Sequence, residues 1–364
     1  MKKLFFIAAI AGAALVGCTK NELAPSVTAQ EEISFAAPVV GAQTKAVNGS
    51  IGATYDTEES FDVWSVWNDA KLGTGTWAGT PYITDKAAKY VTAKGGWAFD
   101  PTYYWPAYGY LSFVALSPSI DKVTTYDATN GFKITEWSQG ASETAIVDLM
   151  YSDESRDHEK AMYTETGDNV DEGSAYTYKG VDIMFNHALS YLVFKVKTKE
   201  NYSGTTQFQL TKITLSNICT TGNFQQKDGG VLKTDPWTEA SSNLGTYVAF
   251  DHERVNPVTA SPFGEIEFSS SSVNVPETSG KQIILLPQAL VDGQQKLTIN
   301  YQIKTADSTW IDQVQEIDLY DGSIKNWEMG KKYIYTLSIS MTEIILDPAV
   351  ADWDDYEPEP GATL

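Results

Sequence analysis

The sequence predicts an all-β protein built from two consecutive antiparallel β-sandwich domains. Short runs in which apolar and polar residues alternate recur along the chain, aromatic residues make up 12% of it, and 27 Gly and 14 Pro separate the runs. Aromatic and β-branched residues favour strands, whereas Gly and Pro favour the turns between strands. At ~150 residues per domain, the 364 residues are enough for two domains that each bury a hydrophobic core.

The composition excludes several classes of partner. The formal net charge is −21, and no stretch of clustered Lys and Arg is present, which argues against binding nucleic acid or docking electrostatically on an anionic membrane surface. With 42% hydrophobic residues the chain has a globular composition. Its 3 His lack the spacing of a zinc site, so we expect neither a metal nor a cofactor.

Residues 1–17 are expected to form a signal peptide. A short basic start is followed by an apolar stretch, residues 4–16, that is too short to span a bilayer permanently. Gly17 and Cys18 at its end resemble the lipobox of bacterial lipoproteins, in which the cysteine is lipidated and becomes the new N-terminus. An ordinary secretory signal with a chance cysteine is the alternative. Once Cys18 is lipidated, Cys219 is the one thiol left, so no disulfide can form within the chain.

Residues 18–45 are interpreted as a tether followed by an N-terminal strand and a hydrophilic stretch. Residues 18–30 are polar and have no periodicity, whereas residues 31–40 alternate. The apolar face expected for this strand consists of Ile33, Phe35, Ala37 and Val39. Pro38 confines the strand to an edge or an end of a sheet. A hydrophilic stretch follows, and within it the Lys45–Ala46 bond is expected to be exposed.

The remaining chain divides into an N-terminal domain, residues 46–185, and a C-terminal domain, residues 186–364. Strands are predicted at residues 61–67, 110–116, 189–197, 210–218, 281–286, 297–303 and 333–340. Hairpin turns are predicted at the Asp-Gly pairs that begin at Asp228, Asp292 and Asp321. Short helices are predicted at residues 85–94 and 153–162, and the charged stretch 152–173 is expected to be a surface loop.

No catalytic motif stands out in the sequence. A glycosidase would need two carboxylates about 5–10 Å apart in a cleft, and an abundance of acidic residues does not by itself provide such a pair. Residues 168–173 have Val170 at a ligand position of a calcium loop, which excludes an EF-hand. His187 is interpreted as a structural histidine with satisfied hydrogen bonds, and residues 352–355 as a solvated strand end.

The aromatic residues near position 105 allow two interpretations. Tyr103, Tyr104 and Trp105 lead directly into an apolar strand, which favours packing in the core. Aromatic faces also stack on sugar rings, so an exposed row would indicate a glycan-binding surface lipoprotein. That alternative requires several of five tryptophans to be exposed: Trp64, Trp67, Trp77, Trp97 and Trp105.

Several segments taken together resemble the fimbrillins, the type V pilus subunits of Bacteroides-type bacteria. The segments are the lipobox at Cys18, residues 103–106 leading to LSFVALSP, residues 148–151, residues 185–190 leading to LVFKVKT, residues 286–288 before LTINYQI, residues 327–335, and residues 350–353. Their order and spacing extend over almost the whole chain.

The resemblance implies transthyretin-like β-sandwich domains and a lipoprotein precursor exposed on the outer membrane. In this family a trypsin-like protease cuts after a basic residue and removes an N-terminal strand, which opens a groove for a strand of a neighbouring subunit. By this resemblance, residues 31–40 would be the removable strand within residues 18–45, and Lys45 followed by Ala46 would be the processing site, where the family more often has Arg. The implied partners are other fimbrial subunits, the maturation protease and the outer membrane. The implied role is a fimbrial subunit in cell adhesion or biofilm formation, not an enzyme.

The resemblance also points to a C-terminal donor strand. Residues 340–353 contain the apolar residues Ile344, Ile345, Leu346 and Val350, which are suited to filling a groove. The alternative is that this segment pairs within its own domain.

Overall fold

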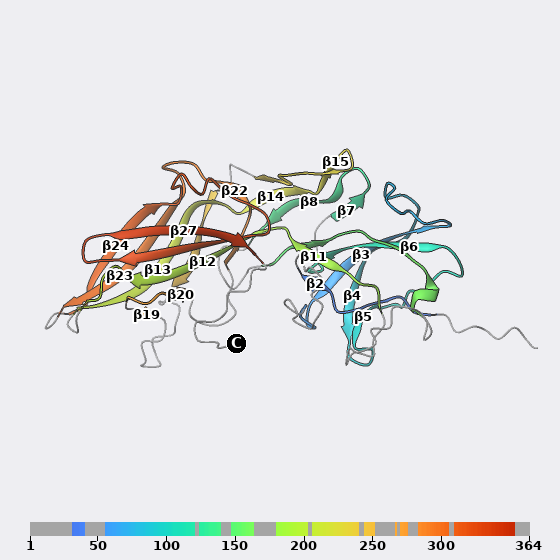
Figure 1. Cartoon of the computed structure of the whole chain (residues 1–364), viewed down its shortest axis with the longest axis horizontal. Coiled ribbons are helices and arrows are strands. Elements are labelled where there is room, and N and C mark those ends of the chain that lie inside the picture. The colour runs from blue at the N-terminus through green and yellow to red at the C-terminus, as the bar shows by residue number, and fades with distance from the viewer. Residues whose placement is uncertain are drawn as a thin grey trace, which may run out of the picture.

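The computed structural model describes residues 31–40, 55–120, 124–139, 147–163, 180–202, 206–239, 244–251, 266–267, 270–275, 283–305 and 309–353. In these ranges the regular elements are strands, together with one short 3₁₀ turn, η1 (Lys160–Tyr163). The predicted all-β class is therefore confirmed. Figure 1 shows strands gathered at the two ends of the long axis, with β8 and β14 lying along one side between them.

The N-terminal half is organised around a nine-stranded sheet with the order β1-β5-β4-β3-β6-β9-β11-β2, in which β10 also pairs with β6. Its strands are β1 (Ser34–Phe35), β2 (Val39–Val40), β3 (Ser60–Asn68), β4 (Thr80–Val91), β5 (Gly96–Phe99), β6 (Tyr110–Ser117), β9 (Met150–Ser152), β10 (Ser155–His158) and β11 (Met184–His187). Residues 31–40 supply both end strands, so one short segment joins the two ends of the sheet.

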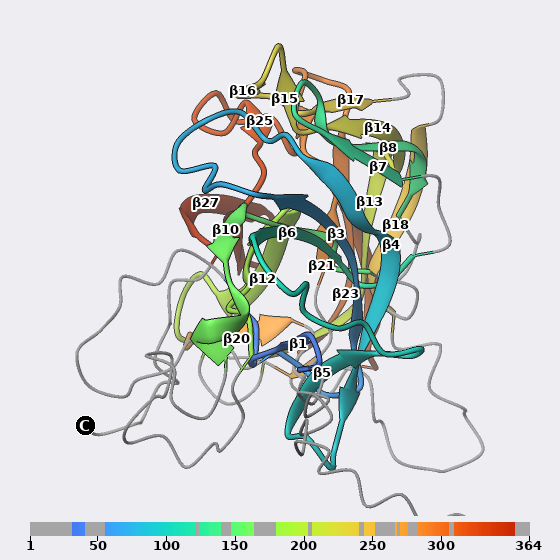
Figure 2. The ribbon, with the colours of Figure 1, turned by 90° about the vertical axis from the view of Figure 1, so that its right-hand side faces the viewer.

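The C-terminal half consists of two facing sheets. One has the order β20-β12-β26-β27 with β21 on β12, and the other has the order β18-β13-β23-β24 with β19 on β13. Their strands are β12 (Ser190–Thr198), β13 (Thr206–Cys219), β18 (Leu244–Asp251), β19 (Ile266–Glu267), β20 (Val273–Val275), β21 (Ile283–Leu285), β23 (Lys296–Thr305), β24 (Ile311–Asp318), β26 (Lys331–Ile339) and β27 (Ile344–Asp352). Alternate residues of β12 and β23 are buried, and they form one core with Tyr335 and Leu215. Figure 2 shows these strands behind the N-terminal sheet.

A four-stranded sheet, β17-β14-β8-β7, connects the two halves. Its strands are β7 (Thr124–Asp127), β8 (Gly131–Ser138), β14 (Thr221–Gln225) and β17 (Trp237–Glu239). Phe132 and Trp137 of β8 share a buried cluster with Phe224 of β14 and with Leu286, and we call this cluster the junction core. The predicted boundary between residues 185 and 186 falls within β11, so the division into two domains remains a prediction.

The remaining strands form two separate two-stranded sheets, which show the outcome of the predicted hairpin turns. The turn at Asp228–Gly229 joins β15 (Lys227–Asp228) to its partner β16 (Val231–Leu232), as predicted. The prediction of hairpin turns at Asp292 and Asp321 was wrong. Asp292 lies between β22 (Gln288–Ala289) and β23, and Asp321 lies between β24 and β25 (Asn326–Trp327). Neither of these strand pairs is bonded, because β22 pairs with β25 and β23 pairs with β24. Two strand pairs, β2–β11 and β12–β26, are parallel, which the purely antiparallel expectation did not include.

The prediction of a helix at residues 85–94 was wrong. Most of this segment belongs to β4, which pairs with β3 on one side and β5 on the other. Helix-favouring Ala and Lys residues are overridden here by two ladders of backbone hydrogen bonds. Residues 153–162 form β10 and part of η1 and not an α-helix. In the described part of the chain, no helix is long and apolar enough to cross a membrane.

Candidate functional site

Residues 31–40 lie between two strand edges and pair with both. Ser34 and Phe35 pair antiparallel with β5, and on the other side Phe35 forms a parallel bridge with Val181. Further along, Val39 and Val40 pair in parallel with β11. The segment therefore closes the nine-stranded sheet on itself, and we call the channel that holds it the groove, formed by β5, residues 103–105 and residues 180–185.

Backbone hydrogen bonds hold the segment along its length. Ile33 N donates to Tyr103 O at 2.8 Å, and Trp105 N donates to Glu31 O at 2.9 Å. On the opposite flank Ala36 N donates to Val181 O at 3.1 Å and Val39 N donates to Ile183 O at 3.0 Å. These bonds use both edges of one extended segment, which is the arrangement of an inner strand.

Two side chains of the segment are completely buried. Ile33 and Phe35 have an exposed fraction of 0%. The Phe35 ring lies 5.4 Å from Phe61, 5.5 Å from Phe99 and 5.7 Å from Phe113, edge-on to each. Such edge-to-face contacts contribute about 0.5–1.5 kcal/mol each beyond the burial itself. We call the space that these three rings form the Phe35 socket.

The predicted apolar face is correct for Ile33 and Phe35 and wrong for Ala37 and Val39. Ala37 is exposed and Val39 is 41% exposed, whereas Pro38 and Val40 are buried. Residues 36–38 lie outside the strands, where the segment leaves its pairing with β5 and begins pairing with β11. The alternation of inward and outward side chains shifts by one residue across this irregular stretch. The buried positions are therefore 33, 35, 38 and 40.

Gly180 brings the opposite wall of the groove unusually close to the segment. A Cβ atom at this position would lie 2.3 Å from Ala36 N and 2.3 Å from the carbonyl carbon of Phe35. Both are backbone atoms, so the segment would have to move to accommodate any larger residue. No motif around this glycine indicated its role in the sequence.

The predicted lipidation and processing residues lie outside the described part of the chain. These are Cys18, Lys45 and Ala46, together with the signal peptide and the polar tether. The calcium-like residues 168–173 also lie outside it. Within the described ranges, no group of three or more His, Cys, Asp or Glu residues is arranged to hold a metal ion.

The predicted donor residues lie in β27, which pairs along its whole length with β26 of the same chain. β27 is the last strand of its sheet. Ile344 is buried, Leu346 is half-buried, and Ile345 and Val350 are 42% and 52% exposed. The segment thus pairs within its own half in this structure, as the alternative expectation held, and it occupies a sheet edge.

The end of β27 differs from the predicted solvated strand end. Trp353 is buried, and its ring stacks on His187 with the ring centres 3.9 Å apart. His187 Nδ1 also contacts the Asp148 carboxylate at 3.0 Å. His187 is therefore a satisfied structural histidine, as predicted, and it anchors the C-terminal end of β27 beside the junction core.

The exposed row of tryptophans required for a glycan-binding surface is not formed by the five predicted residues. Trp64, Trp77, Trp97 and Trp105 are buried. The fifth, Trp67, donates from its ring nitrogen to Tyr108 O at 2.9 Å. Core packing, the favoured interpretation of the aromatic residues near position 105, holds for Trp105, which stacks on the Tyr163 ring.

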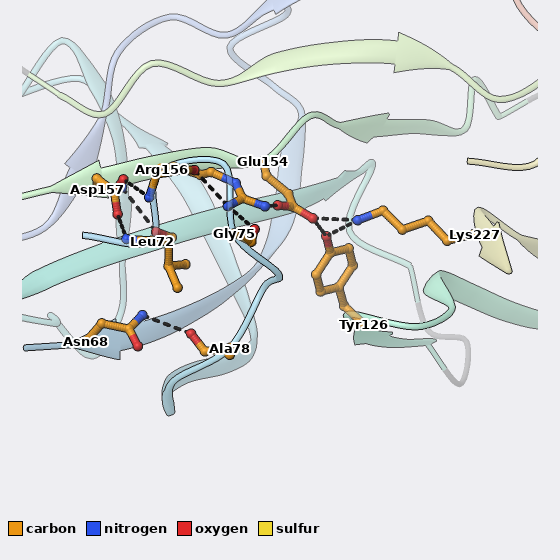
Figure 3. Close-up of polar contacts among 11 residues, drawn as sticks. Asn68, Leu72, Gly75, Ala78, Tyr126, Glu154, Arg156, Asp157 and Lys227 are labelled. Atoms are coloured by element: carbon orange, nitrogen blue, oxygen red, sulfur yellow. Dashed lines mark hydrogen bonds and ion pairs between the residues drawn. The ribbon is translucent and has the colours of Figure 1, made fainter. Parts of the chain in front are cut away.

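A polar network that sequence reasoning missed centres on Glu154 (Figure 3). Its carboxylate accepts hydrogen bonds from Tyr126, Lys227 and Arg156. Burial opposes ionisation of Glu154, but the bonds from Lys227 and Tyr126 outweigh it, so the pKa of this carboxyl lies below its ordinary value. Glu154 therefore remains an ionised structural acceptor, unlike a general acid, which must carry a proton.

The same network fixes the loop that follows β3. Arg156 Nη1 donates to Gly75 O at 2.7 Å, and the Asp157 carboxylate accepts from Leu72 N at 2.6 Å and Gly73 N at 2.7 Å. Asp157 itself has a φ of +62°, in the left-handed region. The network thus connects β10, the β3–β4 loop and β15.

Ser155 and His158 lie close enough to suggest a nucleophile and its base. The Ser155 hydroxyl donates to Asp182 O at 2.9 Å, so His158 Nε2 must donate to Ser155 Oγ, at 2.7 Å. In that tautomer Nδ1 accepts from the Tyr163 hydroxyl. A catalytic base would instead accept the serine proton, so this arrangement is structural.

Comparison with known proteins identifies the family. A family model described as fimbrillin-like matches residues 44–353. The fold is similar to that of a fimbrial protein from Bacteroides vulgatus, with a TM-score of 0.52 and 14% identity over 88% of this chain and 99% of that chain. A proposed cell adhesion protein from Bacteroides ovatus has a TM-score of 0.48 and 16% identity over 90% of this chain and 100% of that chain. No curated protein matches the sequence.

At 14% identity the Bacteroides vulgatus structure shows a shared fold alone. The family match covers most of the chain, including the motifs between residues 103 and 353 that first pointed to it. The chain therefore belongs to the fimbrillin-like family.

Proposed function

We propose that this chain is a structural subunit of a surface fimbria that serves cell adhesion or biofilm formation, and that it is not an enzyme. The family membership and the fold shared with a fimbrial protein support this role. In the proposal, Cys18 is lipidated, and the precursor is carried to the outer membrane and exposed on the cell surface.

The assembly step is strand exchange triggered by proteolysis. A trypsin-like maturation protease cuts between Lys45 and Ala46 and frees residues 18–45, which include the segment in the groove. The observation that carries the proposal is that, among the residues that the structure describes, the segment 31–40 supplies the strands at both ends of the nine-stranded sheet. Their removal leaves the body of the sheet, from β5 through β11, intact.

The groove left behind is a strong acceptor for another strand. Each exposed backbone edge carries unpaired N–H and C=O groups, and an open strand edge is a template for pairing with another chain. Burying a large apolar side chain contributes about 1.5–3 kcal/mol, and the empty positions of Ile33 and Phe35 offer two such sites. A strand from a neighbouring subunit that adds to the sheet restores the backbone hydrogen bonds at both edges and the buried apolar side chains.

The energetics also set the order of events. The same backbone bonds and buried side chains retain the segment after the cut, each hydrogen bond contributing about 0.5–1.5 kcal/mol. We therefore expect cleavage to precede release and release to accompany the entry of a donor strand. Because the donor and the groove are different surfaces, repetition of this contact generates an open filament.

Limited trypsin digestion of the purified chain without residues 1–18 tests the proposal. The expected result is one early cut after Lys45, loss of the fragment that contains Phe35, and growth of SDS-resistant ladders. The Lys45→Gln variant is the control, and it should remain uncut at this bond and monomeric. Resistance of the native bond would contradict the processing step. Loss of the fragment without any assembly would contradict a polymerising role.

A further inference from the structure

A cluster of aromatic side chains lies at the surface where β3 ends and β6 begins. Tyr108 is 70% exposed and Tyr104 is 37% exposed, whereas Trp67 and Tyr82 are half-buried and pack against the core of the N-terminal sheet. We call these four residues the aromatic platform. Aromatic residues gathered in one place mark a binding surface more reliably than scattered exposed apolar residues do.

Tyr108 is held against Trp67 in a defined geometry. The Trp67 ring nitrogen donates to Tyr108 O at 2.9 Å, and the ring centres are 5.4 Å apart with an interplanar angle of 86°. A perpendicular contact joins the edge of one ring to a face of the other. It therefore covers at most one face of the Tyr108 ring, and the high exposure of this residue agrees with an open face on the other side.

Tyr82 and Tyr104 extend the platform along the same end of the sheet. Thr80 is the register partner of Trp67, and Tyr82 follows two residues later on β4. The Tyr82 hydroxyl donates to Tyr104 O at 2.6 Å, which joins β4 to the segment that leads into β6. The platform is thus assembled from β3, β4 and residues 104–108.

Two glycines let the chain pass close to Trp67 on both sides. A Cβ atom on Gly109 would lie 2.5 Å from Trp67 Nε1 and 2.5 Å from Asn68 O, and a Cβ atom on Gly79 would lie 2.7 Å from Trp67 O. Their φ angles are +84° and +144°, which residues with a side chain rarely adopt. Asn68 also donates to Ala78 O at 2.9 Å (Figure 3). These close contacts fix the loops beside Trp67, so the platform is preformed.

The segments that carry most of the platform are uncharged. Residues 72–84 and residues 101–120 contain no Asp, Glu, Lys, Arg or His, although charged residues make up 20% of the chain and its formal net charge is −21. Thr80 is exposed opposite Trp67, and Asn68 is half-buried next to it, so hydroxyl and amide groups border the rings. The result is a neutral aromatic surface on a strongly acidic protein.

Aromatic faces bordered by neutral hydrogen-bonding groups are suited to a carbohydrate. The negative face of an aromatic ring attracts the weakly positive C–H groups of a sugar ring, and amide and hydroxyl groups bond to sugar hydroxyls. The negative charge of the chain repels anionic polymers, which disfavours an acidic polysaccharide. A second copy of this chain carries the same charge, so the same repulsion disfavours it as the occupant.

The platform differs from the row of tryptophans that the sequence suggested for a glycan-binding surface. Of those five tryptophans it contains Trp67 alone, and its exposed rings are those of Tyr104 and Tyr108. Tyr110 is close in sequence, but the Lys71 ammonium lies over its ring, 5.4 Å from the ring centre, so we do not include it.

We propose that the aromatic platform binds a neutral carbohydrate, with the open face of Tyr108 stacked on a sugar ring. The inference rests on the adhesive role proposed above and names the class of ligand for it. It does not depend on cleavage at Lys45 or on strand exchange, because the platform is complete in a single uncut chain.

Affinity electrophoresis of the uncut chain without residues 1–18 tests the inference. The native gels contain mannan, xylan, laminarin or dextran as neutral polysaccharides, and polygalacturonate as an acidic one. At least one neutral polysaccharide should slow migration in a saturable way, and polygalacturonate should not. Absence of retardation by every neutral polysaccharide, or retardation by polygalacturonate alone, would overturn the inference. Assembly of the trypsin-cut chain is measured separately, so this failure is distinguishable from failure of the fimbrial role.

Three variants locate the binding site. Tyr108→Ala should weaken binding at least tenfold, whereas Tyr108→Phe, which keeps the ring, should bind within twofold of the native chain. Trp310→Ala removes a half-buried ring from the C-terminal half and should bind as the native chain does. Unchanged binding by Tyr108→Ala, or an equal loss in Trp310→Ala, would contradict the placement at the platform. Equal losses in both Tyr108 variants would contradict ring stacking, and circular dichroism checks that all three fold.

Analytical ultracentrifugation of the uncut chain distinguishes a carbohydrate from a second copy as the occupant. The native chain and Tyr108→Ala should sediment at the same rate, as monomers. A dimer that the native chain forms and Tyr108→Ala does not form would assign the platform to a second copy and would overturn the inference.

Discussion

Burial of His158 makes the stability of the folded chain depend on pH. Burial lowers the pKa of this histidine from 6.5 to about 4 in the folded chain. Between these two values the unfolded chain binds a proton that the folded chain does not bind, so stability falls as the pH is lowered through this range. Below the folded pKa both states are protonated and His158 causes no further change.

The expected effect of His158 is about 2 kcal/mol of unfolding free energy between pH 7 and pH 5. Urea unfolding of the native chain and of His158→Gln at these two pH values measures it. The glutamine does not titrate, so the variant should lose correspondingly less stability on acidification. Equal losses in the two proteins would show that His158 is already protonated in the folded state at pH 5.

At the scale of the element, the segment 31–40 shows how one irregular step redistributes burial. The alternating pattern places Phe35 and Val39 on the same face, yet one is completely buried and the other is 41% exposed. Phe35→Ala should lower the unfolding free energy by about 3–5 kcal/mol, because it leaves a cavity among three rings. Val39→Ala should change it by less than about 0.5 kcal/mol, as expected for an exposed site.

Urea unfolding of these two uncut variants provides the comparison. Both remove apolar atoms from the same short segment, so a difference between their losses of unfolding free energy reports burial and not local strand propensity. Similar losses for the two variants would mean that Val39 also packs inward, as the regular alternation implied.

At the scale of the whole molecule, the junction core couples the two halves. Phe132 and Trp137 come from β8, while Phe224 comes from β14, and the two strands pair directly. Neither half can unfold without exposing part of this shared core. We therefore expect a single cooperative thermal transition, although the sequence suggested two separate domains.

Differential scanning calorimetry of the uncut chain measures this coupling. The ratio of calorimetric to van't Hoff enthalpy should be close to one, as for a cooperative unit. Two resolved transitions would instead support two domains that unfold independently, with a boundary near residue 185. Trypsin-cut protein should show a lower transition temperature, because the segment that closes the sheet is then no longer covalently attached to the rest of the chain.

The sequence was most informative where the signal is local. Alternation with a period of two located the main strands, and it identified Ile33 and Phe35 as inward residues. It was misleading at residues 85–94, where local helix preference was overridden by pairing with β3 and β5. It also missed the network around Glu154, whose members come from distant parts of the chain.

The sequence alone determined the all-β class and the order of motifs that led to the fimbrillin-like family. Both depend on short stretches of neighbouring residues, which can be recognised without knowing how the chain folds. The tertiary structure decided which strands lie side by side and pair. It placed residues 31–40 between β5 and β11, and it buried Trp353 against His187. Such contacts join residues far apart in the chain, and their energy depends on burial and backbone pairing that no local pattern encodes.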